Sequence, residues 1–172
     1  MKRGGVISGM QHGNGSTPPA DLAFRSLLRT FGLLRRVMEP YFGKYGISGA
    51  HWGVLVTLHR AEEEGHESLR LVDLSERLIV RPPSMTSVVD RLQRMSLVGR
   101  AASPTDQRAK LVRLTAKGRA LVARILEGHG ERTAQLLGGL NEAEQGDLHG
   151  LLERMANHLD EMARHEEAVP AR

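Results

Sequence analysis

The feature that most constrains the fold is a pair of short helical patterns within residues 71–118, separated by two adjacent prolines. Leu71, Leu74 and Leu78 recur at the spacing of one helix face and predict the first helix. The Pro-Pro pair breaks this pattern, and proline is tolerated in the first turn of the next helix because its missing N–H has no partner there. Two short helices joined in this way predict a helix-turn-helix.

The second of these helices has an apolar face and a polar face. Its apolar stripe consists of Met85, Val88, Val89, Leu92 and Met95. Its other faces carry Ser84, Thr86, Ser87, Arg91 and Arg94. Because the stripe packs this helix onto a core, the polar face is free to enter the major groove of DNA.

A two-stranded ribbon is predicted directly after the helix-turn-helix. Residues 98–102 and 110–114 form its arms, and residues 103–107 supply the serine, proline and aspartate that favour a turn. A ribbon in this place extends the helix-turn-helix into a winged helix.

The charge of this stretch indicates a nucleic-acid partner. Positions 81–119 hold nine basic residues and two acids, an excess of seven positive charges, whereas the whole chain carries +4. The nine are Arg81, Arg91, Arg94, Arg100, Arg108, Lys110, Arg113, Lys117 and Arg119. A charge run alone is usually a solvated face, but one that coincides with a helix-turn-helix and a ribbon predicts binding to duplex DNA.

These motifs also resemble a known family. The segments LSERL at 74–78, TSVVDRL at 86–92 and SPTDQRAKLVRLTAKG at 103–118 are similar to the MarR family of winged-helix transcription regulators, over about residues 21–165. The resemblance implies a mainly α fold, a winged helix-turn-helix with flanking N- and C-terminal dimerisation helices. It also implies that Asp106 holds the wing by pairing with a nearby arginine.

The candidate DNA-binding residues lie on the second helix, the turn before it and the ribbon. They are Arg81, Pro83, Ser84, Thr86, Ser87, Arg91, Arg100, Asp106, Arg108 and Lys110. We expect Arg108 to reach the minor groove from the tip of the wing. Short hydroxyl side chains on the second helix suit phosphates and several bases, so they predict no particular operator.

Two positions depart from the family pattern. Ser96 stands just past the second helix, where the family usually has glycine, and serine in a left-handed helix cap costs about 1 kcal/mol. Ser75 stands where alanine is common.

The flanking segments complete the predicted organisation. We expect a tail over 1–19, a first helix for dimerisation and ligand contact over 20–46, a DNA-binding domain over 47–118, dimerisation helices over 119–166 and a second tail over 167–172. Within the last helix, an apolar stripe repeats at near-heptad spacing, through Leu148, Leu151, Leu152, Met155, Leu159 and Met162. Such a stripe is buried most simply against a second copy of the chain, and a homodimer suits a pseudo-palindromic DNA site.

All six aromatic residues fall within 29 consecutive positions, from Phe24 to Trp52. They indicate either a packed core or a pocket for a small aromatic or anionic ligand, with Phe31, Tyr45, His51 and Trp52 as the candidate ligand-binding residues. Many relatives in the resembled family bind phenolic compounds near this junction. Both interpretations stay open at the level of sequence.

Other functional classes have little support. The chain has no cysteine, so disulfides and thiolate metal sites are excluded, and no cofactor motif or catalytic set is present. His59, Glu62 and His66 fit a polar surface loop, over 61–68, better than a metal site. No apolar run is long enough to span a membrane and no signal peptide is evident, so we expect a cytoplasmic protein.

The sequence therefore predicts a DNA-binding transcription regulator, a homodimeric repressor released by a small aromatic or anionic ligand. The alternative is a winged-helix dimer that acts as a protein-interaction module without ligand control.

Overall fold

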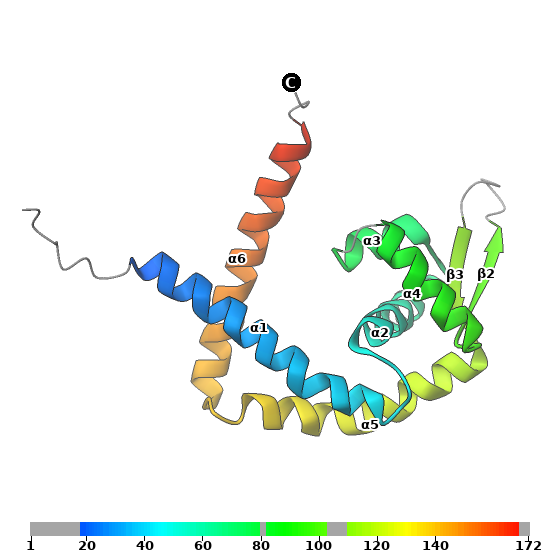
Figure 1. The fold of residues 1–172 in the computed structure, drawn as a ribbon, viewed down its shortest axis with the longest axis horizontal. Helices are drawn as coiled ribbons and strands as arrows, with labels where there is room; N and C mark the ends of the chain where they lie inside the picture. The colour runs from blue at the N-terminus through cyan, green and yellow to red at the C-terminus, as the bar shows by residue number, and fades with distance from the viewer. Residues whose placement is uncertain (1–17, 80–81, 103–109, 169–172) are drawn as a thin grey trace, which may run out of the picture.

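The computed structural model describes residues 18–79, 82–102 and 110–168, in which six helices and three strands follow one another (Figure 1). In order they are α1 (Pro19–Gly43), α2 (Gly49–Glu63), β1 (Leu69–Arg70), α3 (Leu71–Arg77), α4 (Pro82–Arg94), β2 (Val98–Ala102), β3 (Lys110–Leu114), α5 (Ala116–Leu137) and α6 (Glu142–Ala168). The mainly α winged-helix fold expected from the sequence is confirmed.

The sheet is antiparallel and has the order β1-β3-β2. Its ribbon arms, β2 and β3, have the predicted bounds, and Val98 is paired with Leu114 at the base. The two-residue strand β1 is an addition, since Leu69 pairs with Val112 across the free edge of β3. A strand of two residues has no period that a sequence pattern can reveal.

One core holds the winged-helix unit together. Met85, Val89 and Leu92 of the predicted stripe on α4 are buried, and they lie in one cluster with side chains of α2, α3, α5 and the sheet. Burial of this stripe fixes which face of α4 is left for DNA.

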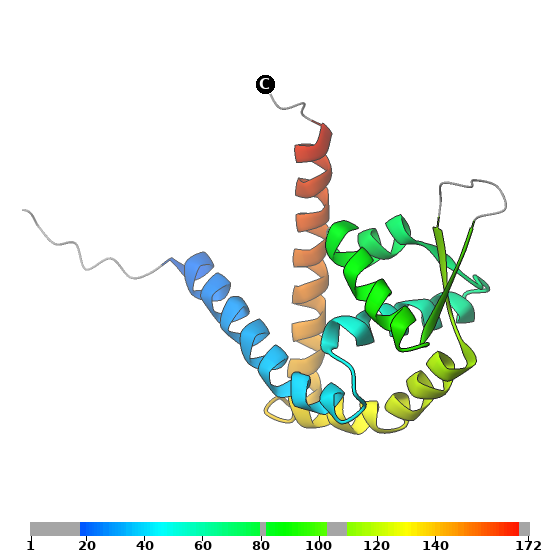
Figure 2. The same ribbon diagram turned by 45° about the vertical axis from the view of Figure 1, so that its right-hand side comes forward.

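Two helices, α1 and α6, form an arm outside that unit, and α5 leads from the unit to this arm. In Figures 1 and 2 the long helix α5 runs beneath the winged helix, and α6 rises from its far end, away from the sheet. Every described side chain from His149 to His165 on α6 is exposed. Among the described helices, none combines the length and apolarity that crossing a membrane requires.

One expectation about a helix boundary was wrong. The polar loop predicted over 61–68 begins later, because α2 continues to Glu63, Ala61 is buried in the core and Glu62 is held by Arg119.

Candidate DNA-binding site

The free face of α4 carries the side chains that the sequence assigned to DNA. Pro83, Ser84, Ser87 and Arg91 are exposed, and Thr86 is half-buried. These side chains lie on the face of α4 opposite its buried stripe, and this face points away from the core. The structure therefore leaves the N-terminal turns of α4 accessible to a ligand as large as a DNA duplex.

The C-terminal end of α4 is closed by a Schellman motif, in which two backbone N–H groups bond back to the last turn. The N–H of Leu97 donates to the carbonyl of Leu92 at 3.0 Å, and that of Ser96 donates to the carbonyl of Gln93 at 2.9 Å. Ser96 has a φ of 59°, the left-handed geometry that the motif requires and glycine favours. The expected left-handed cap is therefore present, with serine in it.

The start of α5 binds the same end of α4. The hydroxyl of Thr115 donates to the carbonyl of Ser96 at 2.8 Å and accepts from the N–H of Gly118 at 3.0 Å, so it also caps α5. The Lys117 ammonium donates to the carbonyl of Met95 at 3.0 Å. These contacts fix the end of α4, the recognition helix, directly to α5, which leads to the arm.

Gly118 allows this close approach. A Cβ at position 118 would lie 2.1 Å from the carbonyl oxygen of Leu97, a distance at which the two backbones must separate. Two residues of the segment Leu114-Thr115-x-x-Gly118 therefore have a physical role. Thr115 caps α5, and Gly118 leaves space for the carbonyl of Leu97.

Arg100 holds α4 against the ribbon. Its guanidinium donates to the Asp90 carboxylate at 2.5 Å and to the carbonyl of Thr86 at 3.5 Å, and its side chain is only 18% exposed. Although Arg100 was predicted to contact DNA, its charge is thus already engaged inside the protein. Sequence spacing gives no signal for the pair, because Asp90 and Arg100 lie on different elements.

Four of the nine cations have partners among the described residues, and Arg94 is one of them, donating to the carbonyl of Asp90 at 3.4 Å. Besides Arg100 and Lys117, Arg119 makes a two-pronged ion pair with Glu62, at 2.9 and 2.8 Å. Of the nine, Arg91, Arg94, Lys110 and Arg113 are exposed, as are Lys117 and Arg119 despite their contacts. The predicted contacts Arg81, Asp106 and Arg108 lie outside the described residues.

Comparison with known proteins agrees with this geometry. A model of the MarR family matches residues 45–109. The HTH-type transcriptional regulator PecS of Dickeya dadantii (strain 3937) is 29% identical over 138 residues, which cover 80% of this chain and 82% of PecS. A crystal structure of a MarR mutant from E. coli complexed with operator DNA is similar with a TM-score of 0.70 and 25% identity, over 76% of this chain and 91% of that chain.

The chain belongs to the MarR family. AbsC, a MarR family transcriptional regulator from Streptomyces coelicolor, shares the fold with a TM-score of 0.75 and 21% identity, over 86% of this chain and 98% of that chain. This MarR-family protein is therefore a DNA-binding transcription regulator and not an enzyme. The similarity to DNA-binding regulators favours this function over the alternative, a protein-interaction module without ligand control.

The aromatic side chains of this MarR-family chain occupy several environments. Trp52 is 7% exposed and stacks on Phe42 with ring centroids 5.7 Å apart, inside the core. Tyr45 lies at the surface junction of α1, α2 and α5, with the Arg124 guanidinium 5.5 Å from its ring centre. Phe31 is 66% exposed on α1.

His51, the fourth predicted ligand residue, caps α2. Its Nδ1 accepts from the N–H of Ser48 at 3.1 Å, while the Ser48 hydroxyl accepts from the N–H of His51 at 3.3 Å. Burial, together with the nearby charge of Arg91, lowers the pKa of His51 below its usual value. Among the described residues of one chain, the four are therefore spread over different environments, from the core at Trp52 to the exposed Phe31.

His59 and Glu62, which could in principle contribute to a metal site, each have another partner. His59 lies 3.6 Å from Glu63 one turn along α2, and Glu62 is paired with Arg119. Across residues 18–79, 82–102 and 110–168, no group of three or more potential ligands is placed to hold a metal ion.

Proposed function

We propose that this MarR-family regulator is a homodimeric repressor of a pseudo-palindromic operator, released by a small aromatic or anionic ligand. The recognition helix α4 reads the major groove through Ser84, Thr86, Ser87 and Arg91, with Arg81 and Pro83 at its start. Arg108 reaches the minor groove, Lys110 contacts phosphate, and Asp106 supports the wing.

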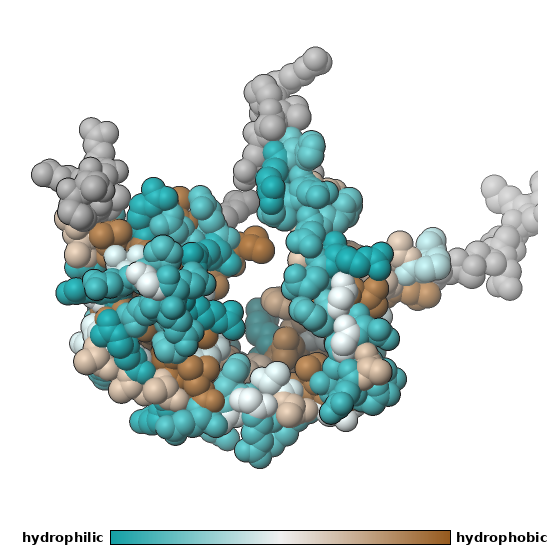
Figure 3. Space-filling view, turned by 180° about the vertical axis from the view of Figure 1, so that it is seen from behind, coloured by the Kyte–Doolittle hydropathy of each residue, from teal (hydrophilic) through white to brown (hydrophobic). Residues whose placement is uncertain are grey.

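The single observation that supports a dimer most strongly is the exposed apolar surface of the arm. Large apolar side chains are exposed along α1 at Leu22, Phe24, Leu28, Phe31, Leu33, Leu34 and Val37, and along α6 at Leu151, Leu152, Met155, Leu159 and Met162. Figure 3 shows hydrophobic side chains on this arm and beside the hollow between it and the winged-helix unit. Apolar surface of this extent is typical of a protein interface.

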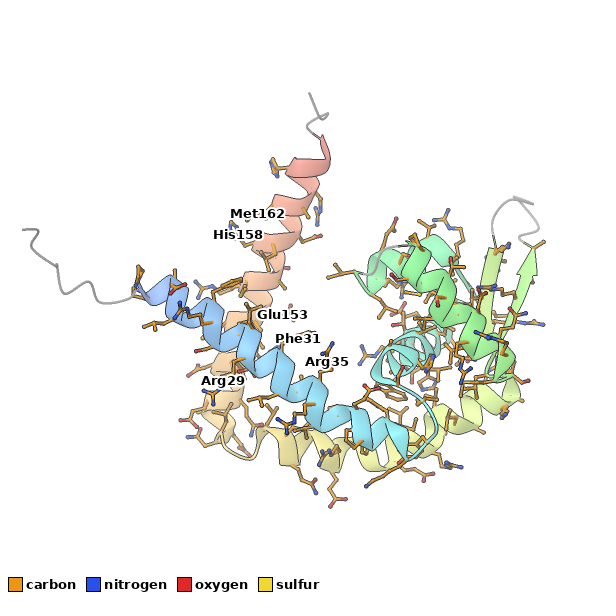
Figure 4. The ribbon with its side chains drawn as sticks, viewed as in Figure 1. Arg29, Phe31, Arg35, Glu153, His158 and Met162 are labelled. Carbon is orange, nitrogen blue, oxygen red and sulfur yellow. The ribbon has the colours of Figure 1, made fainter. Side chains whose placement is uncertain are left out.

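The charges of the two arm helices are complementary. Helix α1 carries four arginines and two acids, whereas α6 carries eight acids and two arginines. Figure 4 shows Arg29, Phe31 and Arg35 on α1, and Glu153, His158 and Met162 on α6. Opposite charges around apolar stripes favour pairing of α1 in one copy with α6 in the other.

A dimer offers a simple mode of control. The two recognition helices must lie roughly 34–36 Å apart to read both half-sites of an operator. The aromatic residues at the junction of α1, α2 and α5 lie between the arm and the winged-helix unit, so a ligand bound there changes this separation. Such a ligand acts only through its different affinities for the two dimer geometries.

The test is the salt dependence of binding to duplex DNA, on a fragment selected from the genome with the purified protein. Each phosphate contact contributes about 0.9 to the negative slope of log affinity against log salt, so several contacts give a slope of several units. We expect Arg108→Ala to weaken binding and reduce the slope while the dimer stays intact. A slope near zero for the unmodified protein, or an unchanged affinity for Arg108→Ala, would contradict the proposal.

A further inference from the structure

Two helices, α1 and α5, connect the winged-helix unit to the arm, and each is anchored in the unit at one end. The C-terminal end of α1 places Phe42 in the core, and the first half of α5 places Val122 and Ile125 there. Beyond Ile125, every residue of α5 from 126 to 137 is half-buried or exposed. A change in the position of the arm relative to the unit must therefore bend both helices just outside the core.

Helix α5 has two glycines at this level. A Cβ at position 130 would have no described atom outside its own stretch of helix within 4 Å, and one at position 128 would meet only the Tyr41 hydroxyl, at 3.9 Å. Close packing therefore requires neither glycine, in contrast to Gly118. Glycine in the interior of a helix is less favourable than alanine because its backbone has more conformational freedom. Residues 128–130 are thus a point at which α5 bends easily.

Two side-chain hydrogen bonds act on the backbone of α5 beside these glycines. The Tyr41 hydroxyl donates to the carbonyl of Ile125 at 3.3 Å, and the Thr133 hydroxyl donates to the carbonyl of His129 at 2.8 Å. In a regular helix each of these carbonyls accepts a backbone N–H, and side chains that share such carbonyls often bend the helix. The curved course of α5 in Figures 1 and 2 thus has local causes.

Helix α1 has a weak point at the same level. Pro40 lies inside α1, and its missing N–H removes one backbone hydrogen bond from the helix. Pro40 and Gly128 line the same cavity, of about 280 Å³, across which Arg132 donates to the carbonyl of Val37 at 3.2 Å. The weak points of the two connecting helices therefore lie beside each other, at a cavity that leaves room for movement.

The recognition helix must move together with the first half of α5. Thr115 and Lys117 bond to the carbonyls at the end of α4, and Gly118 brings the two backbones into contact. A rotation at residues 128–130 therefore turns α4 as part of a rigid unit.

We propose that Pro40, Gly128 and Gly130 form a two-helix hinge, which determines the range of half-site spacings that a dimer accepts in its operator. Half-sites one helical turn apart are separated by about 34–36 Å, and one additional base pair moves a half-site by about 3.4 Å and turns it by about 35°. A stiff dimer loses contacts at one half-site after such a change, whereas a hinged dimer restores them. In its effect on operator choice, the hinge rests on the proposed homodimeric function.

The direct test measures the distance between two spin labels on either side of the hinge. The chain has no cysteine, so Arg60→Cys on α2 and Ala134→Cys near the end of α5 introduce the only two labelling sites, both at exposed positions. Dilution with unlabelled chains leaves only the distance within one chain. We expect Gly128→Ala with Gly130→Ala to narrow the distribution of this distance by about a factor of two, because alanine stiffens the helix. Addition of Pro40→Ala should narrow it further, and no further narrowing would exclude α1 from the hinge.

Gly146→Ala with Gly150→Ala is the matched control. Both glycines lie inside α6, and a Cβ at either position would also have open space among the described residues. This pair brings the same gain in helix propensity without a change in α5, so the width of the distribution should not change. An unchanged width in the variant of Gly128 and Gly130, or an equal narrowing in the control, would overturn the hinge.

A second measurement tests the role of the hinge in operator choice. An operator fragment selected with the purified protein is remade with one base pair inserted or removed between its half-sites. We expect the unmodified protein to lose less than about tenfold in affinity, and the variant of Gly128 and Gly130 to lose at least about tenfold more while it binds the original spacing normally. Equal losses in both proteins would overturn this role. Absence of DNA binding by the unmodified protein would contradict the proposed repressor function, whereas the label distances still decide the hinge because they require neither DNA nor a dimer.

Discussion

At the scale of single residues, two side chains in the described part of the chain occupy backbone geometry that favours glycine. Ser96 has a φ of 59° and Ile79 a φ of 52°. A side chain in this region costs roughly 1–2 kcal/mol, and a β-branched one is a marked outlier. Both residues flank α4, since Ile79 comes just before its first turn and Ser96 just after its last. Strain is thus concentrated at the two ends of the recognition helix.

Replacing Ser96 with glycine should stabilise the protein. Because glycine adopts a positive φ without steric cost, and the carbonyl that accepts from Thr115 is kept, Ser96→Gly should raise the free energy of unfolding by about 0.5–1 kcal/mol. Ser96→Ala, which keeps the Cβ, should bring no gain. Denaturant titration of the three proteins measures the difference, and a gain in both variants would show that φ is not the cause.

Arg100 should strengthen DNA binding indirectly, by its ion pair with Asp90. Asp90→Asn and Arg100→Gln should each weaken DNA binding, and the double variant should be no weaker than the weaker single one. We expect a coupling energy of about 1 kcal/mol, since the carboxylate is partly exposed and solvent weakens the pair. Asp90→Asn with normal affinity, combined with a loss in Arg100→Gln, would instead indicate that Arg100 contacts DNA directly.

At the scale of elements, α2 begins with a reciprocal capping box built from Ser48 and His51. The Nδ1 of a neutral imidazole accepts from the Ser48 N–H, but a protonated ring has no free acceptor. Because burial lowers the pKa of His51, the unfolded chain takes up this proton at a higher pH than the folded one. The cap therefore stabilises α2 most above the usual histidine pKa.

The free energy of unfolding should consequently decline as the pH falls below about 6.5 toward the lower folded-state pKa of His51. His51→Gln supplies an acceptor that does not titrate in this range, and glutamine suits this position of a capping box. The variant should lose less stability between pH 7 and pH 5 than the unmodified protein, as measured by denaturant titration. Parallel pH profiles would exclude His51 as the cause.

The sequence predicted the elements whose pattern is local. The stripe of α4 and the two ribbon arms appear where periodicity and spacing indicated. The contacts that build the site depend instead on distant parts of the chain. Thr115 is bonded to a carbonyl 19 residues earlier, and Arg119 to Glu62, 57 residues away. No local pattern encodes such pairs.

At the scale of the whole molecule, the arm should hold the dimer together. Leu152→Glu places a charge on the apolar stripe of α6, and burial of an unpaired charge costs several kcal/mol. The variant should sediment as a monomer and lose operator binding. Asn157→Glu adds the same charge to α6 away from the stripe and should remain a dimer. A dimeric Leu152→Glu that binds DNA normally would remove this stripe from the interface.

The isolation of α6 has a consequence for how the regulator responds to its own abundance. A helix with nearly all its described side chains in water gains little from the rest of its chain, and most helices owe their stability to packing. If a second copy supplies that packing, folding of the arm is a bimolecular event governed by mass action. At low concentration, newly made chains then have an arm that is not fully folded and that proteases can reach. Binding to DNA as a dimer would begin only once the concentration of the chain exceeds the dissociation constant of the dimer.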